Sequence, residues 1–207
     1  MDIFLILVVA LLVLLFLFLR TAGGKGYLGE FITNRMIGGD QEGSRRTLKN
    51  FMFKDDFHTV EIDHIVIQSN GVFVIETKNY KGKIYGSETK EQWTQYLGNQ
   101  AFALYNPIKQ NWNHINYLRK RLGTKKYFHS IIVFMASSEL KVKTKTPVVK
   151  PLELRKELKK DTGANLSAGE VEELYQRLQD IKQADNVSKR EHVKSVQKHL
   201  RTKKKQQ

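Results

Sequence analysis

Two carboxylates and a lysine are conspicuous in the segment EIDHIVIQSNGVFVIETK, residues 61–78. Asp63 interrupts one apolar run, and Glu76 and Lys78 end the next. Side chains of these types can bind a hard divalent cation, stabilise charge on a phosphate and orient a water molecule. Metal-dependent hydrolysis of a phosphodiester needs these three functions. If the fold brings the three side chains together, the segment predicts a hydrolytic centre.

A β-hairpin would bring them together. Two β-branched apolar runs, residues 62–67 and 72–75, flank an Asn-Gly pair at 70–71. Asn-Gly between such runs is a strong signal for a two-residue type I′ turn, because both of its central residues need a positive φ. The sequence therefore predicts a hairpin that turns at residues 70–71.

The register of that hairpin predicts which charges are neighbours. With the turn at 70–71, Asp63 lies opposite Lys78, and Glu76 lies opposite Ile65 and diagonal to Asp63 at about 7–8 Å. All three charges then project from one face of the sheet. The alternative is a surface Asp–Lys pair with a neighbouring Glu, but aspartate is disfavoured inside strands.

Composition limits the protein class and its partners. The chain has 207 residues, is 41% hydrophobic and contains no cysteine. It is long enough for one domain with appendages, and disulfides and thiolate metal sites are excluded. The formal charge of +14 and the pI near 9.8 indicate a polyanionic partner, either nucleic acid or an anionic membrane surface. A solvated basic tail would explain part of the excess.

The N-terminus predicts a membrane anchor. Residues 3–19 form a run of seventeen residues without a charged side chain. Seventeen residues is the lower length limit for a spanning helix. The basic region that starts a cleaved signal peptide is missing. Because basic residues follow the run, we expect a single-pass protein with its N-terminus outside and its C-terminal bulk in the cytoplasm. The expected anchor is residues 1–20, joined by a Gly-rich linker at 21–25.

The middle of the chain alternates helical and strand patterns, which predicts an α/β domain with a mixed sheet. A helix at 26–37 carries Glu30, which spacing alone leaves open as a surface residue or a site carboxylate. A helix at 106–122 starts at an Asn-Pro pair and carries Gln110 and His114 on one side. Trp93 is expected in the core. The expected strands are 45–53, 58–68, 71–78, 84–86, 92–97 and 127–136, with a turn at Asp55-Asp56.

Residues 141–207 form a basic, mainly helical extension. An edge strand is expected at 140–149 and helices at 151–160, 167–182 and 187–205, the second with a Ser-x-x-Glu capping box. The last helix is dense in lysine and arginine, and it could bind nucleic acid or lie on acidic lipid. Its apolar positions Val193, Val196 and Leu200 could pack on the preceding helix.

Three further residues are candidates for phosphate contacts. Lys81 and Lys83 follow the second hairpin strand, and His114 lies one helical turn after Gln110. Contacts to phosphate give salt-dependent affinity without sequence preference. A solvated turn explains the lysines equally well, and ordinary packing explains His114. Since the sequence contains no base-reading motif, we expect little sequence specificity.

At these motifs the sequence resembles the NERD (nuclease-related) domain of the PD-(D/E)xK nuclease superfamily, over residues 26–140. The resemblance implies a mixed sheet with flanking helices and a site at the broken end of a central hairpin. It implies that Asp63, Glu76 and Glu30 hold Mg²⁺ or Mn²⁺, that Lys78 is catalytic, and that Gln110 is the polar residue from the later helix. The motifs are GYLGE (Glu30), EIDHIVI (Asp63), GVFVIETKNYKG (Glu76, Lys78) and NPIKQNWNHINYL (Gln110).

The expected function is that of a membrane-anchored, metal-dependent nuclease-like protein that hydrolyses DNA, with RNA as the second candidate. The alternative is a non-catalytic membrane-tethered adaptor that binds nucleic acid or protein. Metal-independent, salt-sensitive binding would indicate the adaptor. The sequence leaves the physiological substrate, the exo or endo mode and the oligomeric state open.

Overall fold

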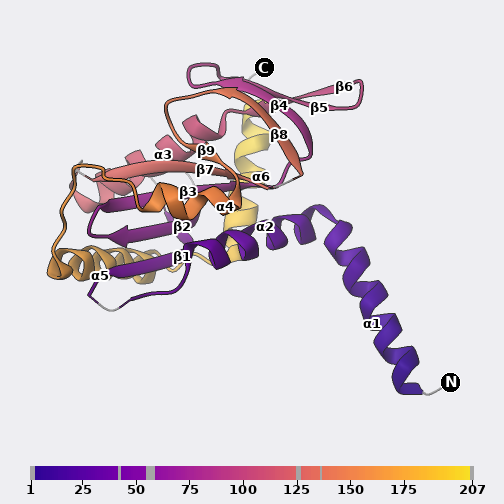
Figure 1. Ribbon diagram of the computed structural model, residues 1–207, viewed down its shortest axis with the longest axis horizontal. Helices are drawn as coiled ribbons and strands as arrows, with labels where there is room; N and C mark the ends of the chain where they lie inside the picture. The colour runs from indigo at the N-terminus through magenta and orange to yellow at the C-terminus, as the bar shows by residue number, and fades with distance from the viewer. Residues whose placement is uncertain (1–2, 42, 55–58, 125–126, 136, 206–207) are drawn as a thin grey trace.

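The structure is a computed structural model that describes residues 3–41, 43–54, 59–124, 127–135 and 137–205. Within these residues the chain forms six helices and two mixed sheets (Figure 1). The predicted α/β core with a mixed sheet is therefore confirmed. The turn expected at Asp55-Asp56 lies outside the described residues.

The main sheet has five strands in the order β1-β2-β3-β7-β9. The first three strands are antiparallel, and β7 and β9 continue the sheet in parallel. The strand β3 thus has a neighbour on each side. The strands are β1 (Arg45–Lys54), β2 (Thr59–Gln68), β3 (Gly71–Lys78), β7 (Phe128–Phe134) and β9 (Val148–Val149).

The second sheet has four strands in the order β6-β5-β4-β8, and it lies above the main sheet in the view of Figure 1. Two sequence expectations differ here. The strand β6 was not expected, and the single edge strand predicted at 140–149 is divided between β8 and β9 in different sheets. The strands are β4 (Gly82–Ser87), β5 (Gln92–Leu97), β6 (Gln100–Tyr105) and β8 (Ser138–Lys143).

Helices cover both faces of the main sheet. On one face, α3 (Pro107–Leu122) and α5 (Ala168–Asp185) pack over the side chains that include Ile65 and Val74. On the other face, α2 (Ala22–Ile37) and α4 (Pro151–Leu158) pack over a second apolar cluster. Trp93 is buried in a third cluster beneath the second sheet, as expected.

Local capping explains where the helices begin. Asn106 caps α3 through its side chain, with Pro107 in the first turn, and Ser167 and Glu170 form the predicted capping box of α5. The helix α2 begins earlier than expected, because the Thr21 side chain accepts a hydrogen bond from the Gly24 amide. Most of the linker expected at 21–25 is thus the first turn of α2.

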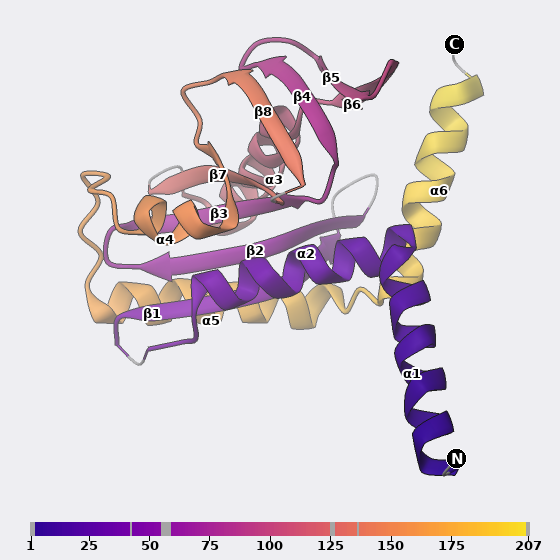
Figure 2. The ribbon, with the colours of Figure 1, turned by 45° about the vertical axis from the view of Figure 1, so that its right-hand side comes forward.

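The N-terminal helix α1 (Ile3–Arg20) extends away from the sheets (Figure 2). Among the helices of the described residues, none has the length and apolar character that crossing a membrane requires. The anchor expected at residues 1–20, its membrane contact through 3–19 and the single-pass localisation are therefore wrong. At about 1.5 Å per residue, seventeen apolar residues reach about 26 Å, which is less than the roughly 30 Å of a hydrocarbon core.

The hairpin register differs from the prediction by two positions. Gln68 pairs with Gly71, so the turn is Ser69-Asn70 rather than Asn70-Gly71. Gly71 belongs to β3 with a φ of 133°, and a Cβ there would lie 2.9 Å from the Tyr127 carbonyl oxygen. This crowding between strands requires glycine inside the strand, so the glycine does not mark the turn.

The corrected register changes which charges face each other. His64 pairs with Ile75, so the next positions, Asp63 and Glu76, lie opposite each other. A shift of two positions keeps every side chain on its predicted face. Glu76 and Lys78 still share the face that α3 covers, because both contact Gln110 of that helix. Asp63 has Glu76 as its cross-strand neighbour rather than Lys78.

The buried His64 imidazole should make the fold less stable in mild acid. Burial, and then the charge of Lys49, lowers the pKa of His64 from 6.5 to about 4. The unfolded chain thus binds this proton more readily, and the stability that is complete above about pH 6.5 is lost as the pH falls toward about 4. We expect urea denaturation to show that wild type loses about 2–3 kcal/mol more than His64→Leu between about pH 7 and 4.5. Equal losses for the two proteins would contradict this assignment.

Candidate active site

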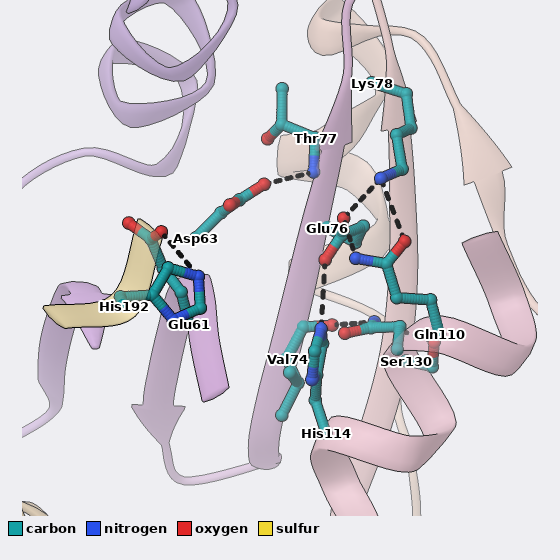
Figure 3. Close-up of polar contacts among 11 residues, drawn as sticks. Glu61, Asp63, Val74, Glu76, Thr77, Lys78, Gln110, His114, Ser130 and His192 are labelled. Carbon is teal, nitrogen blue, oxygen red and sulfur yellow. Dashed lines mark hydrogen bonds and ion pairs between the residues drawn. The ribbon is translucent and has the colours of Figure 1, made fainter. Parts of the chain in front are cut away.

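Glu76, Lys78 and Gln110 form a closed hydrogen-bonded cluster at the end of β3 (Figure 3). The Lys78 ammonium donates to Glu76 Oε1 at 2.6 Å and to Gln110 Oε1 at 3.0 Å. The Gln110 Nε2 amide group donates to the same Glu76 oxygen at 2.8 Å. Each of the three side chains thus contacts the other two, which fixes the position of the Lys78 charge.

Glu76 is the most buried charged group of this cluster, at 4% exposure. Its second carboxylate oxygen, Oε2, lies 3.6 Å from His114 Nε2 (Figure 3). Burial alone would raise the pKa of Glu76, but Lys78 and His114 outweigh burial and lower the pKa to about 2. Glu76 is therefore a carboxylate across the whole range of physiological pH.

Lys78 carries the matching positive charge. Burial would lower the pKa of its ammonium group, but the carboxylate of Glu76 more than offsets burial, so the pKa is raised. The group is consequently an ammonium ion at neutral pH, available as a fixed donor and positive charge.

Asp63 faces Glu76 from β2, where the ladder between the two strands ends. Its Oδ2 atom accepts a hydrogen bond of 2.7 Å from the Thr77 amide. Burial, and then the charge of Glu76, raises the pKa of Asp63 well above its ordinary value, although the Thr77 amide and Lys78 act in the opposite direction. Burial together with the neighbouring Glu76 carboxylate therefore favours the neutral form of Asp63.

The helix α3 is aligned by a buried amide next to Gln110. Asn111 is fully buried and donates 2.8 Å to the Val74 carbonyl oxygen of β3 and 2.9 Å to Ser130 Oγ of β7. These bonds fix the first turns of α3 against two adjacent strands. Gln110 and, one turn later, His114 are thereby directed at Glu76.

Glu30 approaches the same end of the sheet from α2, on the opposite face. Burial raises the pKa of Glu30, the charges of Glu61 and Glu76 add to the rise, and the charge of Lys189 and a hydrogen bond from the Asn50 side chain counter it. Glu30 therefore lies within electrostatic reach of Glu76. Among the described residues, the hydrogen bonds and ion pairs of the Glu76–Lys78–Gln110 cluster do not include Glu30, so its predicted metal role stays a prediction.

Asn50 is a residue that the sequence reasoning missed. It occupies the position on β1 between the pairs Lys49–His64 and Phe51–Ile62, and so lies across from Asp63. Its φ is 45°, in the left-handed region, where asparagine is one of the few side chains tolerated. An asparagine in the middle of a predicted strand was the available signal, since asparagine is depleted in strands.

The donor set of this site fits a hard cation with few protein ligands. Within the described part of the chain, no three His, Cys, Asp or Glu side chains are grouped closely enough to form a metal site by themselves. Mg²⁺ keeps several waters and takes one or two carboxylates, so the facing pair Asp63 and Glu76 is sufficient. Burial is the main cause of the raised pKa of Asp63, and a cation between the two carboxylates would offset the second cause, the charge of Glu76.

The last helix, α6 (Lys189–Lys205), forms a wall beside this site. Thr59 at the start of β2 donates its amide to Ser195 Oγ at 3.1 Å, and its hydroxyl lies 2.9 Å from His192 Nδ1. His192 Nε2 also lies 3.4 Å from Glu61 Oε2 (Figure 3). The basic helix therefore packs on β2. The predicted packing of its apolar positions on α5 is not seen, because the side chains of Val193 and Val196 are 47% and 39% exposed. The side chain of Leu200 lies outside the described residues.

A cavity of about 260 Å³ opens between α6 and α3. Glu61 and His192 line it on one side, and Gln110 and His114 line it on the other. Of the residues expected to contact phosphate, His114 is therefore beside Glu76, whereas Lys81 and Lys83 are exposed on the loop and strand that follow β3.

The conformation of Asn50 gives a prediction about stability. Alanine at a left-handed φ is strained by roughly 1–2 kcal/mol, whereas glycine is not. We expect chemical denaturation to show that Asn50→Gly is more stable than Asn50→Ala by about 1 kcal/mol. At an ordinary strand position such as Thr47 the order should reverse, with alanine the more stable. Glycine and alanine of equal stability at position 50 would contradict the left-handed assignment.

Comparison with known proteins agrees with the motifs. Residues 25–135 match the model of the nuclease-related domain, NERD. An uncharacterized protein of Bacillus anthracis is 33% identical over 175 residues, which cover 82% of this chain and 82% of that protein. No solved structure gives a significant match. The chain therefore belongs to the NERD family of nuclease-related proteins.

Proposed function

We propose that this protein is a metal-dependent nuclease that hydrolyses phosphodiester bonds, with DNA as the main candidate substrate. The observation that carries the proposal is the Glu76–Lys78–Gln110 cluster facing Asp63. Membership of a nuclease-related family gives the class of chemistry, and the buried, opposed charges supply groups suited to it.

Asp63 and Glu76 would hold the metal ion, Mg²⁺ or Mn²⁺. A bound divalent cation offsets charge on the scissile phosphate and lowers the pKa of a coordinated water molecule. Glu76 is already ionised, so it can bind a cation without losing a proton. Asp63 has a raised pKa, so a cation competes with a proton for its carboxylate.

Lys78 would stabilise the negative charge that develops on the phosphate. Its ammonium group is preorganised by Glu76 and Gln110, so little rearrangement is needed when substrate binds. Gln110 positions both charged groups, because its amide accepts from Lys78 and donates to Glu76. His114 is placed to contact a phosphate oxygen at the edge of the cavity.

Nucleic acid as the substrate is supported by the charge of the chain. The formal charge is +14, and Lys81 and Lys83 follow the proposed catalytic strand with exposed side chains. Such lysines bind the phosphate backbone without reading its sequence. We therefore expect cleavage with little sequence preference that weakens as salt increases.

The decisive test is metal-dependent cleavage by the full-length protein. Purified chain should cut plasmid, linear DNA or single-stranded DNA with Mg²⁺ or Mn²⁺ and not with EDTA. Lys78→Ala and Glu76→Gln should each reduce the rate by about 100-fold or more, because each removes charge next to the scissile phosphate. Rates are read from gels of end-labelled substrate.

Matched surface variants exclude a contaminating nuclease. Lys156→Ala and Glu173→Gln change the same residue types at exposed helical positions and should cut as fast as wild type. If Lys78→Ala and Glu76→Gln cut as fast as these controls, the proposed site is not catalytic. Binding without cleavage in every condition would favour the nucleic-acid-binding adaptor instead.

Metal binding should release a proton from Asp63. Because the pKa of Asp63 is raised, the apparent Mg²⁺ affinity should increase as the pH rises through that pKa. Titration calorimetry in two buffers of different ionisation enthalpy measures the proton count directly. Asp63→Asn should bind Mg²⁺ more weakly and release no proton, and release of the same number of protons by this variant would contradict the assignment.

A further inference from the structure

The outer face of the second sheet carries exposed tyrosines, which the proposed active site does not use, and exposed lysines that include Lys83. Register places Tyr85 opposite Thr94, Lys83 opposite Tyr96, and Gln92 opposite Tyr105. Residues that are opposite or two apart share a face, so all three tyrosines project from the same side. Tyr85 is 43% exposed, Tyr96 is 40% exposed and Tyr105 is 48% exposed.

The inner face of the same sheet fixes this orientation. Ile84 and Trp93 are buried against Phe134 of the main sheet, with the Trp93 and Phe134 rings stacked at 6.1 Å. Gly86 lies against the Trp93 ring, where a Cβ atom would come within 2.3 Å. Because a slip of one residue would expose this core, the tyrosines are held outward.

The tyrosine rings form an adaptable platform on three adjacent strands. Tyr85 and Tyr96 meet edge to face, with ring centroids 5.5 Å apart and an interplanar angle of 83°. Tyr105 lies on the third strand, β6. Small residues separate the rings, since Thr94, Ala101 and Ala103 occupy the positions between them on the same face.

The same face is positively charged. Lys83 of β4 and Lys141 and Lys143 of β8 project beside the tyrosines, and all three are exposed. Glu139 is the acidic residue of β8 on this face, and it pairs with Lys141 at 2.9 Å. Three lysines against one glutamate leave a net positive surface interleaved with aromatic rings.

The platform is continuous with the proposed active site. The strand β4 follows the end of β3 after the short segment 79–81. At the other edge, Tyr105 lines the cavity of about 260 Å³ that Gln110 and His114 also line. A flexible chain lying across the tyrosines would therefore reach the cavity next to Glu76.

We propose that Tyr85, Tyr96 and Tyr105, with Lys83, Lys141 and Lys143, form a binding surface for single-stranded nucleic acid. Unpaired bases present π-faces that stack on aromatic side chains, while lysines follow the phosphate backbone. A duplex keeps its bases stacked on each other and cannot use the rings in this way. The surface binds without metal and without chemistry, so it stands apart from the nuclease proposal.

Binding by the full-length protein in EDTA tests this inference. The probes are fluorescein-labelled oligo-dT and oligo-U, a DNA duplex of the same length, and an oligonucleotide of the same length with abasic sites in its centre. Fluorescence anisotropy should give tight binding of one or both single strands. The duplex and the abasic strand should each bind at least tenfold more weakly, and the ratio of dT to U affinity distinguishes DNA from RNA.

Variants identify the surface. Replacing the three tyrosines by threonine keeps the β-propensity and removes the rings, and it should weaken oligo-dT or oligo-U binding by at least tenfold. Replacing them by phenylalanine keeps the rings and should restore binding to within about threefold of wild type. Tyr127→Asn, a control at an exposed tyrosine with a φ of 71°, should bind like wild type.

Several results would overturn the proposal, whatever the cleavage assay shows. They are equal binding of the abasic and normal strands, binding of the duplex as tightly as the single strands, or unchanged binding by the threonine variant. If the threonine variant fails to fold, the phenylalanine variant and the abasic strand still decide the matter, because both use a folded protein.

Discussion

A nearly buried carboxylate must be stabilised by neighbouring groups. The groups that stabilise Glu76 connect β3 with α3. An ionised group taken out of water costs several kcal/mol unless positive charge and hydrogen bonds replace its hydration. Here Lys78, Gln110 and His114 supply them. The three partners come from β3 itself and from α3, so the ion pair depends on how that helix is placed on the sheet.

The Glu76–Lys78 ion pair depends on the pairing of β3, on the position of α3 and on the contacts of Gln110. The strand β3 is paired on both sides, which removes its backbone from water and buries Glu76 with it. Asn111 then satisfies a β3 carbonyl group and aligns α3. The aligned helix presents Gln110 to the two charges. The positive partners of Glu76 keep it ionised, whereas burial and then the charge of Glu76 raise the pKa of Asp63.

Much of the architecture follows from patterns in the sequence, and the failures have physical causes. Alternation and turn residues predict the hairpin, the common face of Glu76 and Lys78, and the capped helix that carries Gln110. The register was wrong because Gly71 serves a crowded contact between strands rather than the turn. The strand β6 was missed because both its faces are largely exposed, so its apolar residues show no buried alternation.

The remaining site residues could not be predicted from local patterns. Asn50 matters through its left-handed backbone and its place opposite Asp63, and both depend on the pairing of β1 with β2. His192 meets Thr59 across more than 130 positions of sequence. An apolar run of seventeen residues was interpreted as a membrane anchor, and the length criterion was the weak point of that interpretation.

The packing of α6 on β2 has a consequence for how the protein is made. Ser195 and His192, which contact Thr59, follow it by more than 130 positions, so they leave the ribosome well after the strands of the main sheet. The sheet, α3 and the Glu76–Lys78 pair involve residues up to about position 150, so they can assemble earlier during synthesis. The wall of the cavity closes only after α6 has been synthesised. The order of synthesis therefore separates the formation of the charged centre from the completion of its surroundings.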